Sequence, residues 1–305
     1  LVGSEMCIRD RACPRMEMKE KRMAVHAPTK RVTDILNFLA MEGRACTLSE
    51  ISRGVNSPVS TCSVILRTLV QENFLECSEP AHLYSLGFGV YALSSAFMAP
   101  RTVLRSVLSE MHRVVDACGE ICELGILDGQ DVFYIAKVES QDPIRIVSQV
   151  GMRLPACCTA TGKALLADFS EEDLHRLYGD TLPTVTAHSL TSFAELAAQL
   201  QAIREGHLAR GLRESSREAT SYALPLRFKG SVVASISVSI PLFRISEEKE
   251  EAVGRELRKA KSKIEALMGS RGECIVPLNR SGKNITGTYL SLIHISEPTR
   301  LGMIS

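Results

Sequence analysis

The chain has 305 residues, of which 45% are hydrophobic and 23% are charged, and its formal net charge is +1. This composition is typical of a globular chain with two modest domains. The near-neutral balance means that any basic surface for nucleic acid must be local, and the absence of tryptophan argues against a stacking platform for single strands.

No apolar run approaches the ~18–20 residues of a membrane span, and no signal peptide is evident, so we expect a cytoplasmic protein without membrane contact. The ten cysteines show no CxxC spacing and no histidine at metal-ligand spacing. They are interpreted as reduced thiols, several of them in the core. The sequence therefore predicts no cofactor and no metal site.

The two ends of the chain differ from the rest. LVGSEMCIRDR at the start and YLSLIHISEPTRLGMIS at the end resemble translated sequencing-adapter read-through. Residues 1–15 are therefore expected to be non-native and are excluded from the fold prediction, as tags are. Residues 270–305 are expected to form a disordered tail with a non-native end.

Residues 28–86 have the pattern of three short helices followed by a hairpin. Apolar residues recur at i, i+3, i+4 and i+7 over residues 32–39, which predicts a first helix that ends at Gly43. Residues 47–50 form a capping box, which begins a second helix that ends at Gly54. We expect a three-helix unit with a helix-turn-helix arrangement.

The third helix is predicted to have Ser57 as its N-cap and Pro58 at its first position, and to end near Gln71. Hydroxyls on its exposed face can reach phosphates or base edges, valine can contact a thymine methyl, and arginine can pair with guanine. The candidate DNA-contacting residues are Ser57, Val59, Ser60, Thr61, Ser63 and Arg67. Residues 74–84 are expected to form the hairpin, or wing.

Helix periodicity alone is equally compatible with a three-helix bundle that binds no DNA. Residues 19–70 carry eight basic and four acidic groups, which favours DNA, but the wing adds Glu72, Glu76 and Glu79, which oppose it.

Residues 87–99 are expected to form a linker helix, and residues 100–269 a second domain of class α+β. From Ile121 the hydrophobic period changes from that of a helix to that of strands. Residues 121–138 are predicted to form a hairpin around Asp128-Gly129, residues 144–150 a third strand, and residues 220–240 a second hairpin around Lys229-Gly230. A final amphipathic helix is expected to start near Ser246.

Two features of the second domain suggest a small-molecule site. Small and hydroxyl-bearing residues at 158–162 precede Lys163 and an apolar helix, so their backbone N–H groups suit a carboxylate, although ordinary capping is the more common explanation of such a pattern. Serines alternate with apolar residues over residues 234–240, which places Ser235, Ser237 and Ser239 on one face. That face either meets solvent or lines a partly closed cavity.

The motifs of both halves, in this order, resemble the IclR (isocitrate lyase regulator type) family over about residues 28–268. The carrying stretches are Arg31 to Leu39, Leu48 to Ile51, Pro58 to Leu69, LDGQDVFYIAKVES, VGMRLPACCTATGKALLA and SVVASISVSIP. Val59 departs from the pattern, because family members often have a basic residue there. The resemblance implies an N-terminal winged helix-turn-helix, a helical linker and a C-terminal GAF-like effector-binding domain.

The resemblance implies a non-enzymatic transcriptional regulator whose promoter binding responds to a small carboxylate or aromatic acid. It implies a homodimer or tetramer on a pseudo-palindromic operator of double-stranded DNA. Carried over by position, effector contacts fall on Ala160, Thr161, Ser221, Ser237 and Ser239, with Ile144 and Ile146 as apolar walls. The preceding loop supplies Arg213, Glu214 and Arg217, which would suit an acidic effector.

Three other interpretations remain open. Adjacent Cys157 and Cys158 near a helix start could indicate thiol catalysis, although no histidine lies nearby in sequence. The same pair, or Cys118 with Cys122, could form a thiol-based redox sensor. The acidic wing also allows a protein-interaction module that has lost DNA binding.

Overall fold

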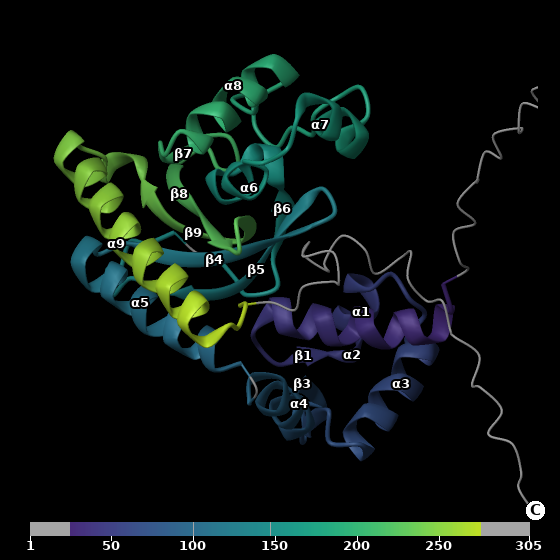
Figure 1. The fold of residues 1–305 in the computed structure, drawn as a ribbon. Helices are drawn as coiled ribbons and strands as arrows, with labels where there is room; N and C mark the ends of the chain where they lie inside the picture. Colours follow the sequence, from purple (N-terminus) through teal and green to yellow (C-terminus); the bar gives the residue numbers. More distant parts are fainter. Residues whose placement is uncertain (1–24, 100, 147, 276–305) are drawn as a thin grey trace, which may run out of the picture. The chain divides into compact units, whose positions relative to one another are not determined.

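The computed structural model describes residues 25–99, 101–146 and 148–275, which divide into two compact units between Gly87 and Phe88 (Figure 1). The predicted non-native residues 1–15 lie outside the described residues, as do residues 276–305 of the predicted tail. Among the helices that the structure describes, none combines the length and the apolar character needed to cross a bilayer.

The first unit contains three helices and a small sheet. These elements are α1 (Ala27–Glu42), β1 (Cys46–Thr47), α2 (Leu48–Gly54), α3 (Val59–Gln71), β2 (Leu75–Ser78) and β3 (Leu83–Leu86). The strands are antiparallel in the order β1-β3-β2, so β2 and β3 form the predicted hairpin. Ile35 and Leu39 of α1 are buried, and Gly43 ends that helix at φ 63°, both as predicted.

The capping box of α2 is confirmed. Thr47 Oγ1 accepts a hydrogen bond from the backbone N–H of Glu50, and the Glu50 carboxylate accepts one from the backbone N–H of Thr47. The hydrogen bond from the Thr47 backbone contributes most to lowering the pKa of Glu50 to about 2. This reciprocal pair fixes where α2 begins.

The prediction that Ser57 caps α3 is wrong. Pro58 is the N-cap residue, and no side chain caps this helix. Ser57 instead closes the turn between α2 and α3, because its N–H donates to the Ser52 carbonyl at 3.0 Å while Ser52 Oγ donates to the Ser57 carbonyl at 2.6 Å. These two hydrogen bonds to Ser52 fix the position of Ser57 in the turn, one residue before the N-cap position of α3.

The second unit is built on one antiparallel sheet, which confirms the α+β class. Its helices are α4 (Phe88–Met98), α5 (Thr102–Cys118), η1 (Ala156–Cys158), α6 (Ala160–Leu165), α7 (Glu171–Tyr178), α8 (Phe193–Arg204), η2 (Leu242–Arg244) and α9 (Glu247–Arg271). Its strands are β4 (Ile121–Asp128), β5 (Asp131–Val138), β6 (Arg153–Pro155), β7 (Ala209–Leu212), β8 (Ala219–Phe228) and β9 (Ser231–Pro241). The six strands lie in the order β6-β5-β4-β9-β8-β7.

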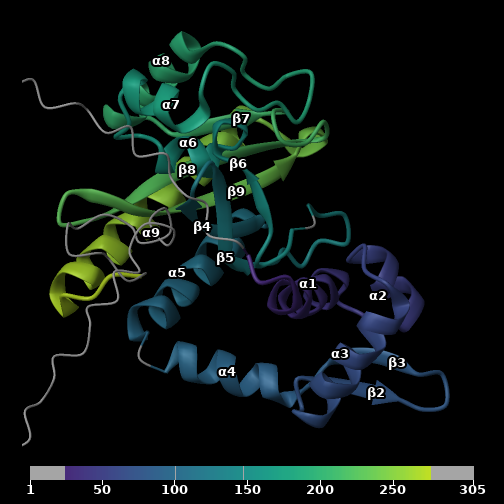
Figure 2. The same cartoon turned by 90° about the vertical axis from the view of Figure 1, so that its right-hand side faces the viewer.

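Helices cover both faces of this sheet (Figures 1 and 2). α5 and α9 lie side by side on one face, where they bury the apolar positions of β4, β8 and β9. α6 lies on the opposite face, with α7 and α8 beyond it. Because side chains alternate along a strand, the polar positions of β4 and β9 face α6.

Both predicted hairpins of the second unit are confirmed, but the strand predicted at residues 144–150 is wrong. β5 pairs instead with β6, where Val132 lies opposite Leu154. The described part of 144–150 is held by side chains: Asp142 accepts from the Ile144 N–H at 2.9 Å, and Lys137 Nζ donates to the Ser148 carbonyl at 2.6 Å. The edge strand β7 was not predicted, because its four residues include an internal glycine and give no clear alternation.

The final helix extends beyond its predicted end. α9 continues to Arg271, and Gly272 ends it in the left-handed conformation at φ 64°. Ile275 is buried in the core of the second unit. The prediction of a disordered tail from residue 270 is therefore wrong for residues 270–275.

Candidate DNA-contacting helix and effector-binding cluster

The predicted DNA face of α3 is its solvent face. Val59, Ser60 and Arg67 are exposed, Ser57, Thr61 and Ser63 are half-buried, and the core-facing residues Cys62, Leu66 and Leu69 are buried. Val64 is 61% exposed on the same face and extends it by an apolar residue. The face can therefore approach a groove without disturbing the core of the first unit.

Arg67 is an exposed cation on this face. Among the described residues of the first unit, Lys30 pairs with Asp34 and Arg44 pairs with Glu42 and Glu50, whereas Arg67 makes no ion pair. Its guanidinium can bind a phosphate or a guanine edge without first breaking a salt bridge within the described residues.

The start of α6 lies against the polar face of the sheet. Thr159 caps the helix by accepting from the Gly162 N–H at 2.9 Å, which is the ordinary capping role left open by the sequence. The next residue but one makes the contact to the sheet: Thr161 Oγ1 donates to Ser237 Oγ at 2.9 Å. Tyr134 of β5 completes this chain of hydroxyls, with its OH 3.4 Å from Thr161 Oγ1.

The serine row of β9 is buried, so the solvated-face interpretation is wrong. Ser235 and Ser237 are 0% exposed and Ser239 is 9% exposed. Ser239 Oγ donates to Glu123 Oε2 at 3.0 Å, and Ser221 of β8 lies opposite Ser239 in the register. The structure thus collects four of the predicted effector residues, Thr161, Ser221, Ser237 and Ser239, on the face that α6 covers.

Ala160 joins the same cluster through a close approach to β7. A Cβ placed on Gly211 would lie 2.9 Å from the Ala160 nitrogen and 2.9 Å from Ser221 Oγ. The absence of a side chain at Gly211 therefore lets an N–H of α6 and a hydroxyl of β8 lie close together. We define the effector cluster as Ala160, Thr161, Ser221, Ser237 and Ser239.

Glu123 is a buried acid beside the effector cluster that the sequence analysis missed. It is 4% exposed, it lies opposite Ser237 in the register, and burial raises the pKa of its carboxyl. Lys137 lies opposite it on β5 and offsets part of that effect. The available signal was a lone glutamate within the apolar run ICELGIL.

The predicted apolar walls, Ile144 and Ile146, come from a segment outside α6, β8 and β9, the elements that supply the effector cluster. Ile144 is 63% exposed, and its carbonyl accepts a hydrogen bond of 2.7 Å from Arg244. Ile146 is half-buried. Both belong to the segment after β5 that forms no strand, and their contact with an effector stays a prediction.

Lys163 of α6 forms a second polar centre, behind the effector cluster. Its side chain is completely buried, and Nζ donates to Gln199 Oε1 at 2.8 Å, to the Arg210 carbonyl at 3.0 Å and to Glu214 Oε1 at 2.5 Å. Burial lowers the pKa of Lys163 and raises that of Glu214. Glu214, predicted to face an acidic effector, is thus engaged by Lys163.

A cavity of about 590 Å³ opens beside this centre, between α8, β7 and α9. Its polar lining comprises Gln199, His207, Arg210, Glu214, Glu250 and Arg258. Arg210 already pairs with Glu250 across it. The cavity is therefore separate from the effector cluster, with Lys163 and β7 between them.

The adjacent cysteines are inaccessible. Cys157 and Cys158 are both 0% exposed, their sulfurs are 3.8 Å apart, and Cys158 Sγ donates to the Pro183 carbonyl at 3.1 Å. The hydrogen bond from Cys157 lowers the pKa of Cys158 to about 7. Cys118 and Cys122 are also buried, and burial raises the pKa of Cys118 to about 11.

Comparison with protein families gives two matches that follow one another along the chain. Residues 28–78 match the IclR helix-turn-helix domain, and residues 97–266 match the family described as bacterial transcriptional regulator IclR C-terminal. Both units of the structure are thereby covered.

Individual relatives agree with this result. The chain is 29% identical over 237 residues to the HTH-type transcriptional repressor AllR of Salmonella typhimurium, which covers 77% of this chain and 87% of the relative. An IclR transcriptional regulator from Alicyclobacillus acidocaldarius superposes with a TM-score of 0.69 at 26% identity, over 80% of this chain and 99% of that one. An IclR homologue from Microbacterium hydrocarbonoxydans, solved with 4-hydroxybenzoate, gives a TM-score of 0.67 at 25% identity, over 80% and 99%. The Salmonella and Alicyclobacillus relatives are described as a transcriptional repressor and a transcriptional regulator, not as enzymes.

Proposed function

Because this chain belongs to the IclR family of bacterial transcriptional regulators, we propose that it binds promoter DNA through α3 and that a small organic acid at the effector cluster changes this binding. The observation that carries the proposal is the buried Thr161–Ser237 hydrogen bond. It places hydroxyl donors from α6 and β9 together in the interior of the second unit, where a carboxylate would replace their mutual contact.

The chemistry of the effector cluster supports an acid as the ligand. Hydroxyls of Thr161, Ser221 and Ser237 and the Ala160 N–H can all donate to a carboxylate. The Microbacterium hydrocarbonoxydans relative is described in complex with 4-hydroxybenzoate, an aromatic acid. Glu123 opposes ligands with two negative charges more strongly than ligands with one, because its carboxyl repels a ligand anion once it ionises.

The proposal includes a homodimer or tetramer on a pseudo-palindromic operator. α4 supports it: none of its residues is buried, and Phe88, Tyr91, Leu93 and Phe97 are between 54% and 78% exposed. A helix with so many exposed aromatic and aliphatic side chains is typical of an interface between copies. Two copies would place two α3 helices about one DNA turn apart.

Coupling between the two functions needs an effector that binds one arrangement of the DNA-binding units more tightly than another. A coupling of ~1–3 kcal/mol is typical for such regulators. The helix α4 follows the first unit directly along the chain, so it can carry a rigid-body change more faithfully than a flexible linker would.

The direct experiment measures fluorescence anisotropy of a labelled fragment of the upstream region of the gene, with the full chain and increasing 4-hydroxybenzoate. Benzoate and small aliphatic acids extend the series, and 4-hydroxybenzamide is the control of similar shape without charge. We expect DNA binding that at least one acid shifts and the amide does not. Binding that no acid shifts would remove the proposed effector class.

A thiol-based redox sensor is the second candidate, favoured by the 3.8 Å separation of the Cys157 and Cys158 sulfurs. Their complete burial opposes it, because an oxidant would reach them only after local opening. DNA affinity measured after peroxide treatment and again after reductant tests the redox sensor. A redox sensor would show a reversible change in DNA affinity that Cys158→Ser abolishes, and an unchanged affinity would exclude it.

A further inference from the structure

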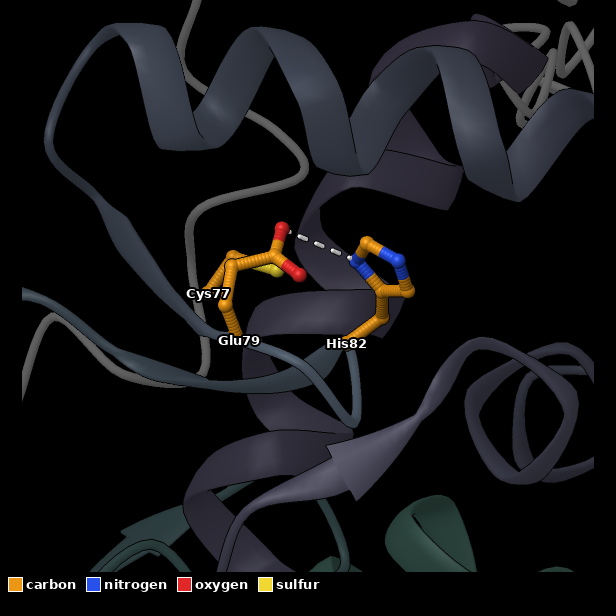
Figure 3. Close-up of side chains that lie close together, drawn as sticks. All are labelled: Cys77, Glu79 and His82. Carbon is orange, nitrogen blue, oxygen red and sulfur yellow. Dashed lines mark ion pairs between the residues drawn. The ribbon is translucent and has the colours of Figure 1, made fainter.

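We propose that Cys77, Glu79 and His82, on the hairpin formed by β2 and β3, bind a divalent transition metal of the zinc type (Figure 3). No metal site was predicted from the sequence, because no cysteine has a histidine at metal-ligand spacing. The hairpin turn changes that relationship, because it folds the two ends of this segment towards each other.

The tight turn between β2 and β3 brings the three side chains together. Cys77 lies in β2 opposite Tyr84, and the register ends with Ser78 opposite Leu83. Glu79 and His82 lie in the turn that joins these two strands, directly after β2 and directly before β3. Figure 3 shows the Glu79 carboxylate beside the Cys77 sulfur and directed towards the imidazole of His82.

The distances leave little rearrangement for coordination. The three ligand atoms all lie within 4.8 Å of one another, and His82 Nδ1 is 3.2 Å from Glu79 Oε1. Tetrahedral zinc with bonds of ~2.0–2.3 Å separates its ligand atoms by roughly 3.3–3.7 Å. The nitrogen–oxygen pair therefore already lies close to the required spacing, and the sulfur lies within 4.8 Å of both atoms. Glu79 and His82 are exposed and can adjust their rotamers without disturbing the core.

The donor set selects the class of metal. One thiolate, one imidazole and one carboxylate suit zinc and its neighbours in the first transition row, whereas calcium and magnesium prefer oxygen alone. Three protein ligands leave a fourth position for water or a further ligand, and the exposure of the site makes exchange easy. We therefore assign an exchangeable site rather than a permanent structural one.

Metal binding would change the charge of the hairpin. The metal adds two positive charges and displaces the thiol proton, so the hairpin gains one positive charge. Without the metal, the negative charge of Glu76 in the same strand opposes an approach of the hairpin to phosphate. If this hairpin is the wing that meets DNA, which rests on the proposed function, zinc would strengthen operator binding.

The first test is cobalt titration of the full chain, with reduced thiols and no DNA. Thiolate-bound Co²⁺ has a charge-transfer absorption that carboxylate or imidazole alone does not produce, and Zn²⁺ should abolish it by displacement. We expect the band to be lost in Cys77→Ser and the affinity to fall about tenfold or more in His82→Ala, since even outer-shell losses have effects of this size.

Two controls localise the signal. Cys274→Ser, and Cys7→Ser with Cys13→Ser, should leave the band unchanged, which separates the hairpin from the other accessible or undescribed thiols. A band that persists in Cys77→Ser, or no band in the parent chain, would overturn the site and leave the Glu79–His82 contact as an ordinary surface ion pair.

The second test compares DNA affinity in Zn²⁺ with affinity in chelator, for the parent chain and for His82→Ala. We expect zinc to tighten binding in the parent alone. Cobalt binding at Cys77 without any zinc effect on DNA would refute the coupling to the wing but keep the metal site. No DNA binding under either condition would instead refute the proposed function.

Discussion

Thr161 Oγ1 donates a buried hydrogen bond of 2.9 Å to Ser237 Oγ, and this contact joins the start of α6 to the middle of β9. The two residues are 76 positions apart, so the contact exists only in the folded second unit. An acid bound between them would exchange this contact for hydrogen bonds to its carboxylate. The contact is therefore where ligand binding would alter the packing of α6 on the sheet.

Ser237→Leu is expected to abolish effector binding while DNA binding is retained. The larger side chain fills the space beside Thr161 and removes a donor, and overpacking of this kind costs about 1–3 kcal/mol of stability. Isothermal titration with the active acid measures the loss, and circular dichroism checks the fold. Ser231→Ala is the matched control, because Ser231 is exposed at the start of the same strand. Equal effects of both variants would contradict the assignment.

Arg67→Ala is expected to weaken DNA binding by about 1–3 kcal/mol and to leave effector affinity unchanged. The guanidinium is exposed on α3 and makes no ion pair among the described residues, so its loss leaves no carboxylate of this unit unpaired. If Arg67 binds phosphate, the slope of the logarithm of the binding constant against the logarithm of the salt concentration becomes shallower by about one. Lys229→Ala removes one exposed charge from the second unit and serves as the control. An unaltered affinity for Arg67→Ala would exclude α3 from the interface.

Effector affinity is expected to fall as pH rises, through the ionisation of Glu123. Burial raises the pKa of this carboxyl, so it stays protonated to higher pH than an ordinary glutamate. Tyr134 and Lys137 of β5 are the titratable neighbours, and Lys137 opposes the shift. Once ionised, Glu123 repels an acid ligand. Titration of the ligand over a series of pH values measures the difference, since the raised pKa moves this ionisation to higher pH than that of an ordinary glutamate.

Glu123→Gln is the matched variant for that pH dependence. It should bind the acid equally well over this series of pH values, because the amide carries no charge. The free energy of unfolding is expected to fall with rising pH, as effector affinity does. The raised folded-state pKa of Glu123 favours the fold at low pH, and this contribution is lost as pH rises through the folded pKa. A parent-like pH profile in Glu123→Gln would assign the effect to another group.

Lys163→Met is expected to destabilise the second unit by about 3–5 kcal/mol, because it leaves the Glu214 carboxylate buried without its cation. Glu214 Oε2 already has no hydrogen-bond partner among the described residues, and without Lys163 the carboxylate would keep a backbone hydrogen bond from Leu212 but no cation. The double variant Lys163→Met/Glu214→Leu should recover most of this loss. Urea unfolding of the parent, Lys163→Met, Glu214→Leu and the double variant measures the coupling, and purely additive losses would show that the two side chains do not interact.

Local signals predicted most of the helices and both long hairpins of the second unit. The capping box at Thr47 and Glu50, the left-handed glycine at Gly43 and the turn at Asp128-Gly129 each specify a boundary through nearby residues alone. Such signals survive in any tertiary context. The wrong cap at Ser57 shows their limit, since a contact with Ser52 decided that turn.

The effector cluster was harder to predict, because it depends on contacts between residues far apart in the sequence. The period of two placed the serines on one face, but only the packing of α6 shows that this face is buried. Glu123 and Lys163 acquire their importance from burial beside partners 116 and 51 residues away. The strand predicted at residues 144–150 failed for the same reason, because β6 occupies the edge of β5.

DNA binding through α3 and acid sensing at the effector cluster can be tested together in one titration. An acid is added to the complex of the full chain with its labelled upstream fragment, for the parent, Arg67→Ala and Ser237→Leu. We expect an acid-dependent change of anisotropy in the parent, weak DNA binding in Arg67→Ala, and DNA binding without acid response in Ser237→Leu. Failure of the parent to bind the fragment at low ionic strength would contradict the proposed function.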